Sequence, residues 1–520
     1  MLSSIVSPPA GAESVLRIGN GQEPETLDPH RGEGVSTLNI LRDLYEGLTT
    51  VAPDGRIVPG AARGWSLAHD GRTYTFELRE DGRWSDGSPV TAADFVAGLR
   101  RSVDPATGSS FIGILAPIVN ADAVAAGRMP PDSLGVRALD ARTLQIQLTV
   151  PTPYFLGVLS HPSSFPIHQP SLRQWGAAFA RSGRLISNGA YRLQTWAVQS
   201  QVSLVRNPHY RDQARVAIDR VVYFPTEDLQ SELKRYRAGE LDITFQIPLV
   251  QAPWIQQQYG DQLRIATYLG VYYYGFNLTR PPFKDNRDLR EALALVIDRD
   301  LIVRKLMNGL AQPATGWVPP GTAGHRAAVP RGQGWTPAQR IAEARRLYAR
   351  AGYSVERPLE IEIRYNTHED HRRIAVVIAA MWKQHLGVRV RLHNEEGKVF
   401  INNRRQRKLT QVFRASWIGD YDDVSTFTDL LQSQHGQNDT GWADAEYDAL
   451  LARAAQARDA LQRQTLLAEA EARLLQEWPV IPIYWYVSKH LVSPRVEGWR
   501  DNILDYHYSK DLRLKPLPPR

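Results

Sequence analysis

The sequence predicts an α/β protein with more than one domain. Segments that alternate apolar and polar residues, such as 72–80, are separated along the chain by segments with apolar residues at helical spacing, such as 286–307. No internal repeat and no long linker interrupts this pattern. The chain has 520 residues, whereas a single hydrophobic core stops growing near about 250–300 residues. We therefore expect several domains joined by short crossings.

Individual elements follow from the same patterns. The first alternating segment places Tyr74, Phe76 and Leu78 on one face, which is typical of a half-buried strand. Thr91, with Asp94 three residues later, indicates the start of a helix. Further strands are predicted at 14–20, 142–150, 359–367 and 387–395, and further helices at 286–307, 336–352, 375–387 and 443–478.

Composition narrows the class of protein. Hydrophobic residues make up 43% of the chain and charged residues 22%, which is ordinary for a soluble globular protein. No apolar run approaches the roughly 18 residues of a membrane span. The net charge of +7 is dispersed, and its densest short cluster, 402–410, is typical of a solvated face, so we expect no nucleic-acid partner. The absence of cysteine excludes disulfides and thiolate metal ligands.

The first residues carry no clear fold signal. Residues 1–14 lack a basic segment, and their apolar stretch is too short for a complete signal peptide. The letters "AGA" before "ES" nevertheless resemble the end of a signal-peptide cleavage site. Two interpretations stay open, a disordered terminus and the remnant of a signal peptide.

Sequence signatures of catalysis are missing. The chain contains no P-loop, no G-x-S-x-G and no H-E-x-x-H motif, so we expect no catalytic residue, no cofactor and no metal. His368 and His371 flank Glu369 and Asp370 at the start of a predicted helix, which raises the alternative of a metal site. We prefer a capped helix entry, where the helix dipole favours acidic residues.

One short stretch gathers negative charge in a basic chain. In "RASWIGDYDDVSTF" (414–427), three acids follow Trp417: Asp420, Asp422 and Asp423. Acids in such a place either cap a following helix or bind a positively charged group. From these residues alone, both interpretations stay open.

Several stretches occur together and in the same order in one known family. They are 26–48, 83–105, 188–210, 272–300, 414–427 and 480–499. Through them the chain resembles the extracytoplasmic oligopeptide-binding proteins of ABC transporters over nearly its whole length after residue 15. Relatives in that family include dipeptide, nickel and murein-peptide binders, and the stretches are most similar to those of the general oligopeptide binder.

The resemblance implies a periplasmic-binding-protein-like fold with two α/β lobes and an extra small domain. One lobe is discontinuous, with 15–46, 170–270 and 488–520. The extra domain takes 47–169, and the second lobe takes 271–487. The resemblance also implies a monomeric, exported periplasmic receptor that captures short peptides and delivers them to ABC transporter permease subunits, and that is not an enzyme.

The same resemblance implies a set of ligand-binding residues. The acid three residues after Trp417, Asp420, pairs with the amine of the ligand, while Asp422 and Asp423 cap the helix that follows. Glu33 is an acid near the start of the ligand. The remaining assignments are Val35, Ser416 and Ile418 for pairing with the ligand backbone; Arg414, Arg404 (or Arg405) and His371 as cations; Tyr268, Tyr273 and Tyr486 as cleft aromatics; Phe111, where the family has a Tyr; and Trp417 as a further ligand-binding residue.

Two alternatives to a general peptide receptor stay open. The same fold can bind a more specialised ligand, such as a murein peptide, a peptide-like antibiotic or a metal chelate. A more remote alternative is a peptide hydrolase that uses Asp and His residues near 368–371 and 420.

Overall fold

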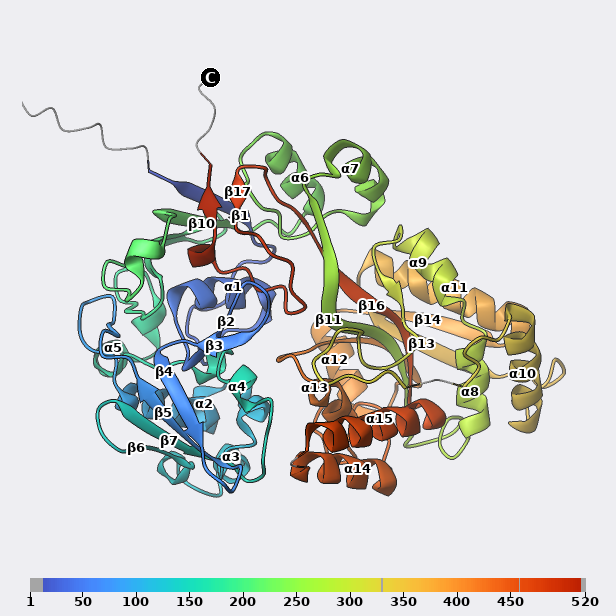
Figure 1. Ribbon diagram of the computed structural model, residues 1–520. Coiled ribbons are helices and arrows are strands. Elements are labelled where there is room, and N and C mark those ends of the chain that lie inside the picture. Colours follow the sequence, from blue (N-terminus) through green and yellow to red (C-terminus); the bar gives the residue numbers. More distant parts are fainter. Residues whose placement is uncertain (1–12, 329–330, 458, 516–520) are drawn as a thin grey trace, which may run out of the picture.

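The computed structural model describes residues 13–328, 331–457 and 459–515, and it confirms the α/β class. Figure 1 shows two lobes side by side, with the blue-to-green part of the chain in the first lobe and the yellow-to-orange part in the second. The long strands β11 (Leu263–Phe276) and β16 (Val480–Leu491) run between them. The C-terminal segment returns to lie beside β1 (Figure 1).

The first lobe is built on a four-stranded sheet from distant parts of the chain. Its strand order is β1-β10-β9-β8, and β1 lies parallel to β10. Ile243 bridges to both Ile18 and Val492, so three remote segments meet here. The elements of this part are β1 (Val15–Gly19), α1 (Gly34–Leu44), β8 (Tyr191–Ala197), β9 (Gln201–Arg206), β10 (Arg220–Phe224), α6 (Leu229–Arg237), α7 (Ala252–Tyr259), β17 (Val496–Glu497) and β18 (Arg513–Leu514).

A second, antiparallel sheet of order β4-β5-β7-β6 lies in the same lobe. Tyr74, Phe76 and Leu78 are buried along β5, as predicted. Thr91 and Asp94 form the predicted capping box at the start of α2. The elements are β2 (Thr49–Val51), β3 (Ile57–Pro59), β4 (Ala62–Leu67), β5 (Thr73–Leu78), α2 (Ala92–Val103), α3 (Ala121–Ala125), β6 (Val136–Ala138), β7 (Thr143–Gln147), α4 (Phe155–Val158) and α5 (Gln169–Trp175).

The second lobe is built on a six-stranded mixed sheet of order β12-β16-β11-β15-β13-β14. Helices cover the sheet on both faces (Figure 1). Its remaining elements are α8 (Arg287–Leu295), α9 (Arg299–Leu306), β12 (Gln312–Pro313), α10 (Pro337–Arg350), β13 (Glu360–Asn366), α11 (Glu369–Leu386), β14 (Arg389–Glu395), α12 (Gly397–Gln406), β15 (Val412–Ile418), α13 (Ser425–Thr428), α14 (Ala445–Gln456) and α15 (Ala460–Glu477).

Two predicted helices are each divided into two. The segment 286–307 forms α8 and α9, because the Asp298 carboxylate accepts a hydrogen bond from the Leu301 amide (2.9 Å) and starts a new helix. The segment 443–478 forms α14 and α15 in the same way, with Asp459 as the cap of the second helix. In both segments, an aspartate within the apolar periodic pattern therefore marks the start of a new helix.

The crossing strands contain an irregularity where the lobes meet. The pairing of β11 with β16 shifts register between Thr267 and Val271. The predicted domain boundaries at 270/271 and 487/488 fall inside these two strands. A register shift weakens the ladder locally, which makes this the place where we expect the chain to bend.

The chain start is described only in part. Residues 1–12 of the predicted terminal segment lie outside the described residues. Glu13 and Ser14 are held in place, because Glu13 pairs with Arg220 (2.8 Å) and the Ser14 amide donates to Asp219 (3.0 Å). These two residues are therefore anchored to the first lobe.

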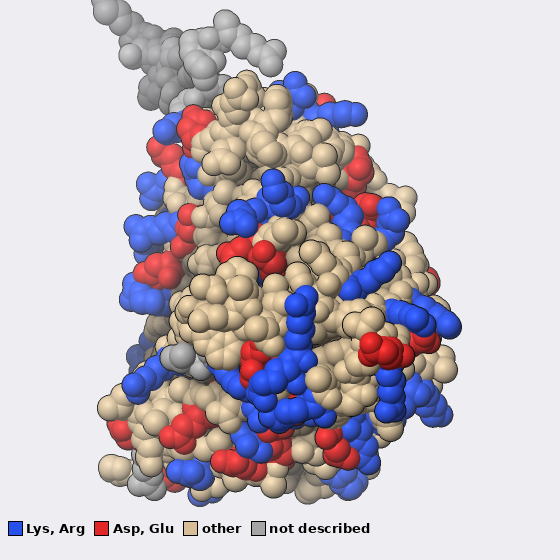
Figure 2. All heavy atoms as spheres, turned by 90° about the vertical axis from the view of Figure 1, so that its right-hand side faces the viewer, with Lys and Arg blue, Asp and Glu red and all other residues tan. Residues whose placement is uncertain are grey.

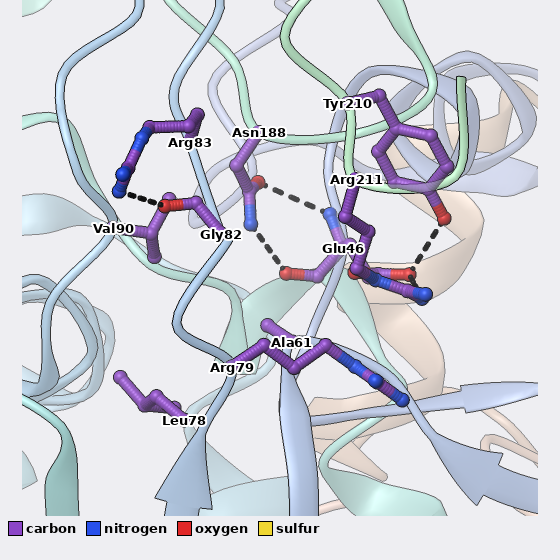
Figure 3. A pocket seen from close by; sticks show the side chains of 10 residues that line it. All are labelled: Glu46, Ala61, Leu78, Arg79, Gly82, Arg83, Val90, Asn188, Tyr210 and Arg211. Carbon is purple, nitrogen blue, oxygen red and sulfur yellow. Dashed lines mark hydrogen bonds and ion pairs between the residues drawn. The ribbon is translucent and has the colours of Figure 1, made fainter. Parts of the chain in front are cut away.

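Within the first lobe, Glu46 lies at the centre of a polar cluster with residues that flank β8 and β9 (Figure 3). Its carboxylate accepts hydrogen bonds from Tyr210 (2.9 Å) and Arg211 (2.6 Å), and its backbone is bonded in both directions by Asn188. The hollow beside it measures about 10 Å³, which is the size of one water molecule. The hollow is too small for a ligand, so we assign this cluster a structural role.

The surface is mixed in charge. On the face of the second lobe that Figure 2 shows, Lys and Arg side chains are spread out with Asp and Glu between them. This distribution agrees with the dispersed charge expected from the sequence. Across the described residues, none of the helices has the length and apolar character needed to cross a bilayer.

Candidate functional site

Two adjoining cavities lie between the lobes. The larger measures about 760 Å³ and the smaller about 140 Å³. Phe111 from the first lobe, and Ile418 and Asp420 from the second, line both cavities. A volume of this size suits an organic ligand, so these residues mark the candidate binding site.

Strand β15 offers an open edge beside the cavities. It pairs with β11 along its whole length, but with β13 only at Val412 and Phe413. From Arg414 to Ile418 the other edge therefore pairs with no strand of the described residues. Such an edge can accept an extended chain as an added strand through main-chain hydrogen bonds.

Asp420 directly follows this edge and carries an unpaired carboxylate. Its amide is fixed by a hydrogen bond to the Thr426 hydroxyl (3.3 Å). In the described chain no side chain or backbone group bonds its carboxylate oxygens. Burial raises the pKa of Asp420 from 3.8 to about 7, with no other cause contributing. A cation placed beside it would stabilise the charged form.

The two neighbouring acids have other partners. Asp423 accepts a hydrogen bond from the amide of Ser425 (2.9 Å), the first residue of α13, although the N-cap position itself is Val424. It also forms two bonds with Arg463, at 2.9 and 2.7 Å. The capping prediction is wrong for Asp422, which instead accepts a bond from the Ala323 amide (2.8 Å) in a different loop.

Arg414, six residues before Asp420, is a buried guanidinium without a carboxylate partner among the described residues. It donates to Asn366 (3.2 Å) and to the Ser416 hydroxyl (3.3 Å). It also lies over the Tyr272 ring, 4.9 Å from the centroid. Arg414 lies within β15, and Asp420 lies two residues beyond the end of this strand at Ile418. The free edge therefore has a cation near one end and an acid just past the other.

The other predicted cations fit less well. Arg404 is already paired with Asp439 (2.6 Å), whereas the alternative, Arg405, lines the larger cavity. Burial, aided by repulsion from Arg414, lowers the pKa of His371 to about 2. Both causes disfavour the charged imidazole in the ligand-free protein, and the role of His371 toward a ligand carboxylate stays a prediction.

The predicted aromatics lie on two sides of the sheet. Tyr268 lines the smaller cavity, and Tyr486 packs edge-on against Tyr484 with a ring distance of 5.2 Å. Tyr273 instead packs against Trp317 (4.9 Å) in the core behind the sheet, so its prediction as a cleft residue is wrong. Strand alternation is the cause, because neighbouring residues point to opposite faces.

The remaining predicted residues lie around the cavities. Trp417 lines the larger cavity and Val35 the smaller one. Glu33 lies just outside, where its carboxylate accepts a hydrogen bond from Ser110, which lines the larger cavity. Ser416 is engaged by Arg414. Six of the predicted residues line the two cavities: Val35, Phe111, Tyr268, Trp417, Ile418 and Asp420. The others line neither cavity, namely Glu33, Tyr273, His371, Arg404, Arg414, Ser416 and Tyr486.

The possible metal ligands at 368–371 form a capped helix entry, as preferred from the sequence. His368 precedes α11, and its ring accepts a hydrogen bond from the Asp370 amide (3.2 Å). In the described chain, a different group of three has its ligand atoms close together, namely His490, Asp505 and His507. There the Asp505 carboxylate is hydrogen-bonded to both imidazoles, each at 3.0 Å. These two bonds already stabilise the negative charge of Asp505.

Comparison with known proteins identifies the family. The chain matches the bacterial extracellular solute-binding proteins, family 5 Middle, over residues 56–439. The periplasmic oligopeptide-binding protein OppA of Escherichia coli (strain K12) is 37% identical over 514 residues, 97% of this chain and 94% of that protein. The "Probable deoxycholate-binding periplasmic protein YgiS" of the same strain is 38% identical over 510 residues, 98% and 95% of the two chains.

Solved structures agree with this result. The Escherichia coli murein tripeptide binding protein MppA matches with a TM-score of 0.86 at 36% identity, over 97% of this chain and 99% of that chain. Its unliganded open form matches with a TM-score of 0.82 at the same identity, over 97% and 98%. The chain therefore belongs to the bacterial extracellular solute-binding proteins of family 5, and the predicted resemblance is confirmed.

Proposed function

We propose that the chain is a periplasmic receptor that binds short peptides between its lobes and passes them to the permease subunits of an ABC importer. It acts as a monomer and catalyses no reaction. By name, OppA binds oligopeptides and MppA binds murein tripeptide. In this proposal the chain divides at the predicted boundaries, and the lobes close about β11 and β16.

One observation carries the proposal. Asp420 and Arg414 are unpaired, opposite in charge, and placed at the two ends of the open edge of β15. A peptide is the ligand that matches all three features, since it carries an amine, a carboxylate and a backbone that can pair as a strand. The amine binds Asp420, and the carboxylate binds Arg414 or, for other lengths, Arg405.

Calorimetry with free and N-acetylated peptides tests this assignment. Acetylation removes the amine charge, and Asp420→Ala removes its partner, so each change alone is expected to cost about 2–5 kcal/mol of binding free energy. Because both remove the same interaction, the two costs do not add. Equal binding of the free and acetylated peptide to the unmodified receptor would refute the amine anchor.

A bile acid is a second candidate ligand because of the similarity to YgiS. The apolar side chains of the larger cavity, among them Phe111, Ile114 and Leu430, suit a steroid. The same cavity, however, presents the carboxylates of Asp420 and Asp429, which repel the carboxylate of a bile acid. Titration with deoxycholate separates the candidates, and we expect it to bind more weakly than a free peptide.

A further inference from the structure

Asp429 is a second unpaired carboxylate in the larger cavity. It begins the short 3-10 helix η8 (Asp429–Leu431), directly after α13. Within the described parts of the chain, no donor bonds its carboxylate and no cation pairs with it. Burial raises the pKa of Asp429 to about 7, repulsion from Asp423 adds to the rise, and Arg463 opposes it.

The neighbouring arginines do not neutralise Asp429. Arg463 already pairs with Asp423 through two hydrogen bonds, at 2.9 and 2.7 Å. Arg405 lines the same cavity but is exposed, and no bond joins it to Asp429. A buried charge without a partner is costly, and Asp420 adds a second one in the same cavity. The cavity is therefore suited to a ligand with two positive charges.

An aromatic wall stands beside Asp429. The rings of Tyr154 and Tyr421 stack in parallel with their centroids 4.4 Å apart, and both line the larger cavity. Asp429 lines the same cavity, and after burial its charge is the next cause that raises the pKa of Tyr154. Aromatic faces pack against the alkyl stem of a lysine or arginine and attract its charged end.

A bound metal ion explains the arrangement less well. The one group of three potential metal ligands with closely spaced atoms in the described residues is His490, Asp505 and His507, and Asp429 is not part of it. An organic cation needs only a carboxylate and an aromatic face, and the larger cavity supplies both.

We propose that Asp429 binds a cationic side chain on the first residue of the ligand, so that the receptor prefers peptides beginning with Lys or Arg. The inference rests on the proposed function, since an amine bound at Asp420 leaves the first side chain as the nearest group to enter the same cavity. Asp429 thus acts as a specificity residue, while Asp420 anchors any free amine.

Calorimetry with matched tetrapeptides tests the preference. Lys-Ala-Ala-Ala and norleucine-Ala-Ala-Ala differ in the side-chain charge, and a third peptide with Nε-acetyl-lysine keeps the length. We expect the receptor to bind the lysine peptide at least tenfold more tightly than the other two. Asp429→Asn should weaken the lysine peptide at least tenfold and change the norleucine peptide less than threefold. The control Asp422→Asn removes a charge outside both cavities and should change neither.

The outcomes separate this inference from the function on which it rests. Equal binding of the three peptides by the unmodified receptor, or equal weakening of all by Asp429→Asn, overturns the inference. If Asp420→Asn still weakens every peptide in that case, the peptide-receptor proposal stands. If no peptide binds, the proposed function itself fails. Circular dichroism verifies that each variant is folded. If Asp429→Asn does not fold, the comparison of the three peptides on the unmodified receptor decides the inference.

Discussion

At the scale of single residues, the site holds charges that the protein itself leaves uncompensated. Asp423 shows the ordinary solution for a buried acid, because Arg463 bonds both of its oxygens. Asp420, three residues earlier, has no such partner, and burial alone raises its pKa to about 7. An unpaired buried carboxylate destabilises the ligand-free protein, and a bound cation removes this cost.

This cost predicts a pH-dependent stability. Between pH 3.8 and about 7, the folded protein holds the Asp420 proton and the unfolded chain does not. The free energy of unfolding therefore falls as pH rises through this window. Asp420→Asn removes the loss, so at pH 8 we expect the ligand-free variant to be more stable by about 1–3 kcal/mol.

Denaturant unfolding at pH 5 and pH 8 measures this effect. The gain from Asp420→Asn should be smaller at pH 5 than at pH 8. Asp423→Asn is the contrast, because it breaks the ion pair with Arg463 and should lower stability at pH 8. A variant Asp420→Asn that is less stable than the unmodified protein at pH 8 would show that the carboxylate already has a stabilising partner.

Which of the acids would stay unpaired could not be read from the sequence alone. Asp420, Asp422 and Asp423 have similar surroundings in the sequence. The partner of Asp423 is Arg463 and the partner of Asp422 is Ala323, and both partners are remote in sequence. The resemblance to a family singled out Asp420. It offered nothing for Asp429, whose exposure to the cavity depends on how the turn after β15 packs against the first lobe.

At the scale of elements, the open edge of β15 sets the mode of binding. Because β13 pairs with β15 only at Val412 and Phe413, the edge of β15 away from β11 pairs with no strand of the described residues from Arg414 to Ile418. A main-chain ladder recognises any peptide regardless of its side chains. The charged ends then fix its direction and length.

An ester scan of the ligand tests this ladder. Each amide of a bound tetrapeptide is replaced in turn by an ester, which removes one N–H donor and keeps the chain length. We expect at least one replacement to lower the binding free energy by about 1 kcal/mol, the net contribution of a typical hydrogen bond. If calorimetry shows every ester bound as tightly as the peptide, the ladder does not form.

The elements themselves were largely predictable, because periodicity reflects burial. The strand 72–80 and the capping box at Thr91 follow the sequence pattern. Two kinds of feature could not be predicted from the sequence pattern. The aspartate caps that divide 286–307 and 443–478 lie within continuous helical periodicity, and the placement of Tyr273 behind the sheet depends on the register of β11.

At the scale of the whole molecule, the site exists where two lobes meet. Phe111 and Tyr154 come from the first lobe, whereas Ile418, Asp420 and Asp429 come from the second. Strands β11 and β16 run between the lobes (Figure 1), and the ladder that they form shifts register between Thr267 and Val271. Because the candidate site lies between the lobes, closure around a ligand is the motion that we expect.

The most direct test is a crystal structure of the protein with a bound tetrapeptide. We predict extended density along Arg414 to Ile418, with the peptide amine within hydrogen-bond distance, about 3 Å, of an Asp420 carboxylate oxygen and with both lobes in contact with the ligand. A peptide bound elsewhere, or bound in this cleft with its amine directed away from Asp420, would contradict the account.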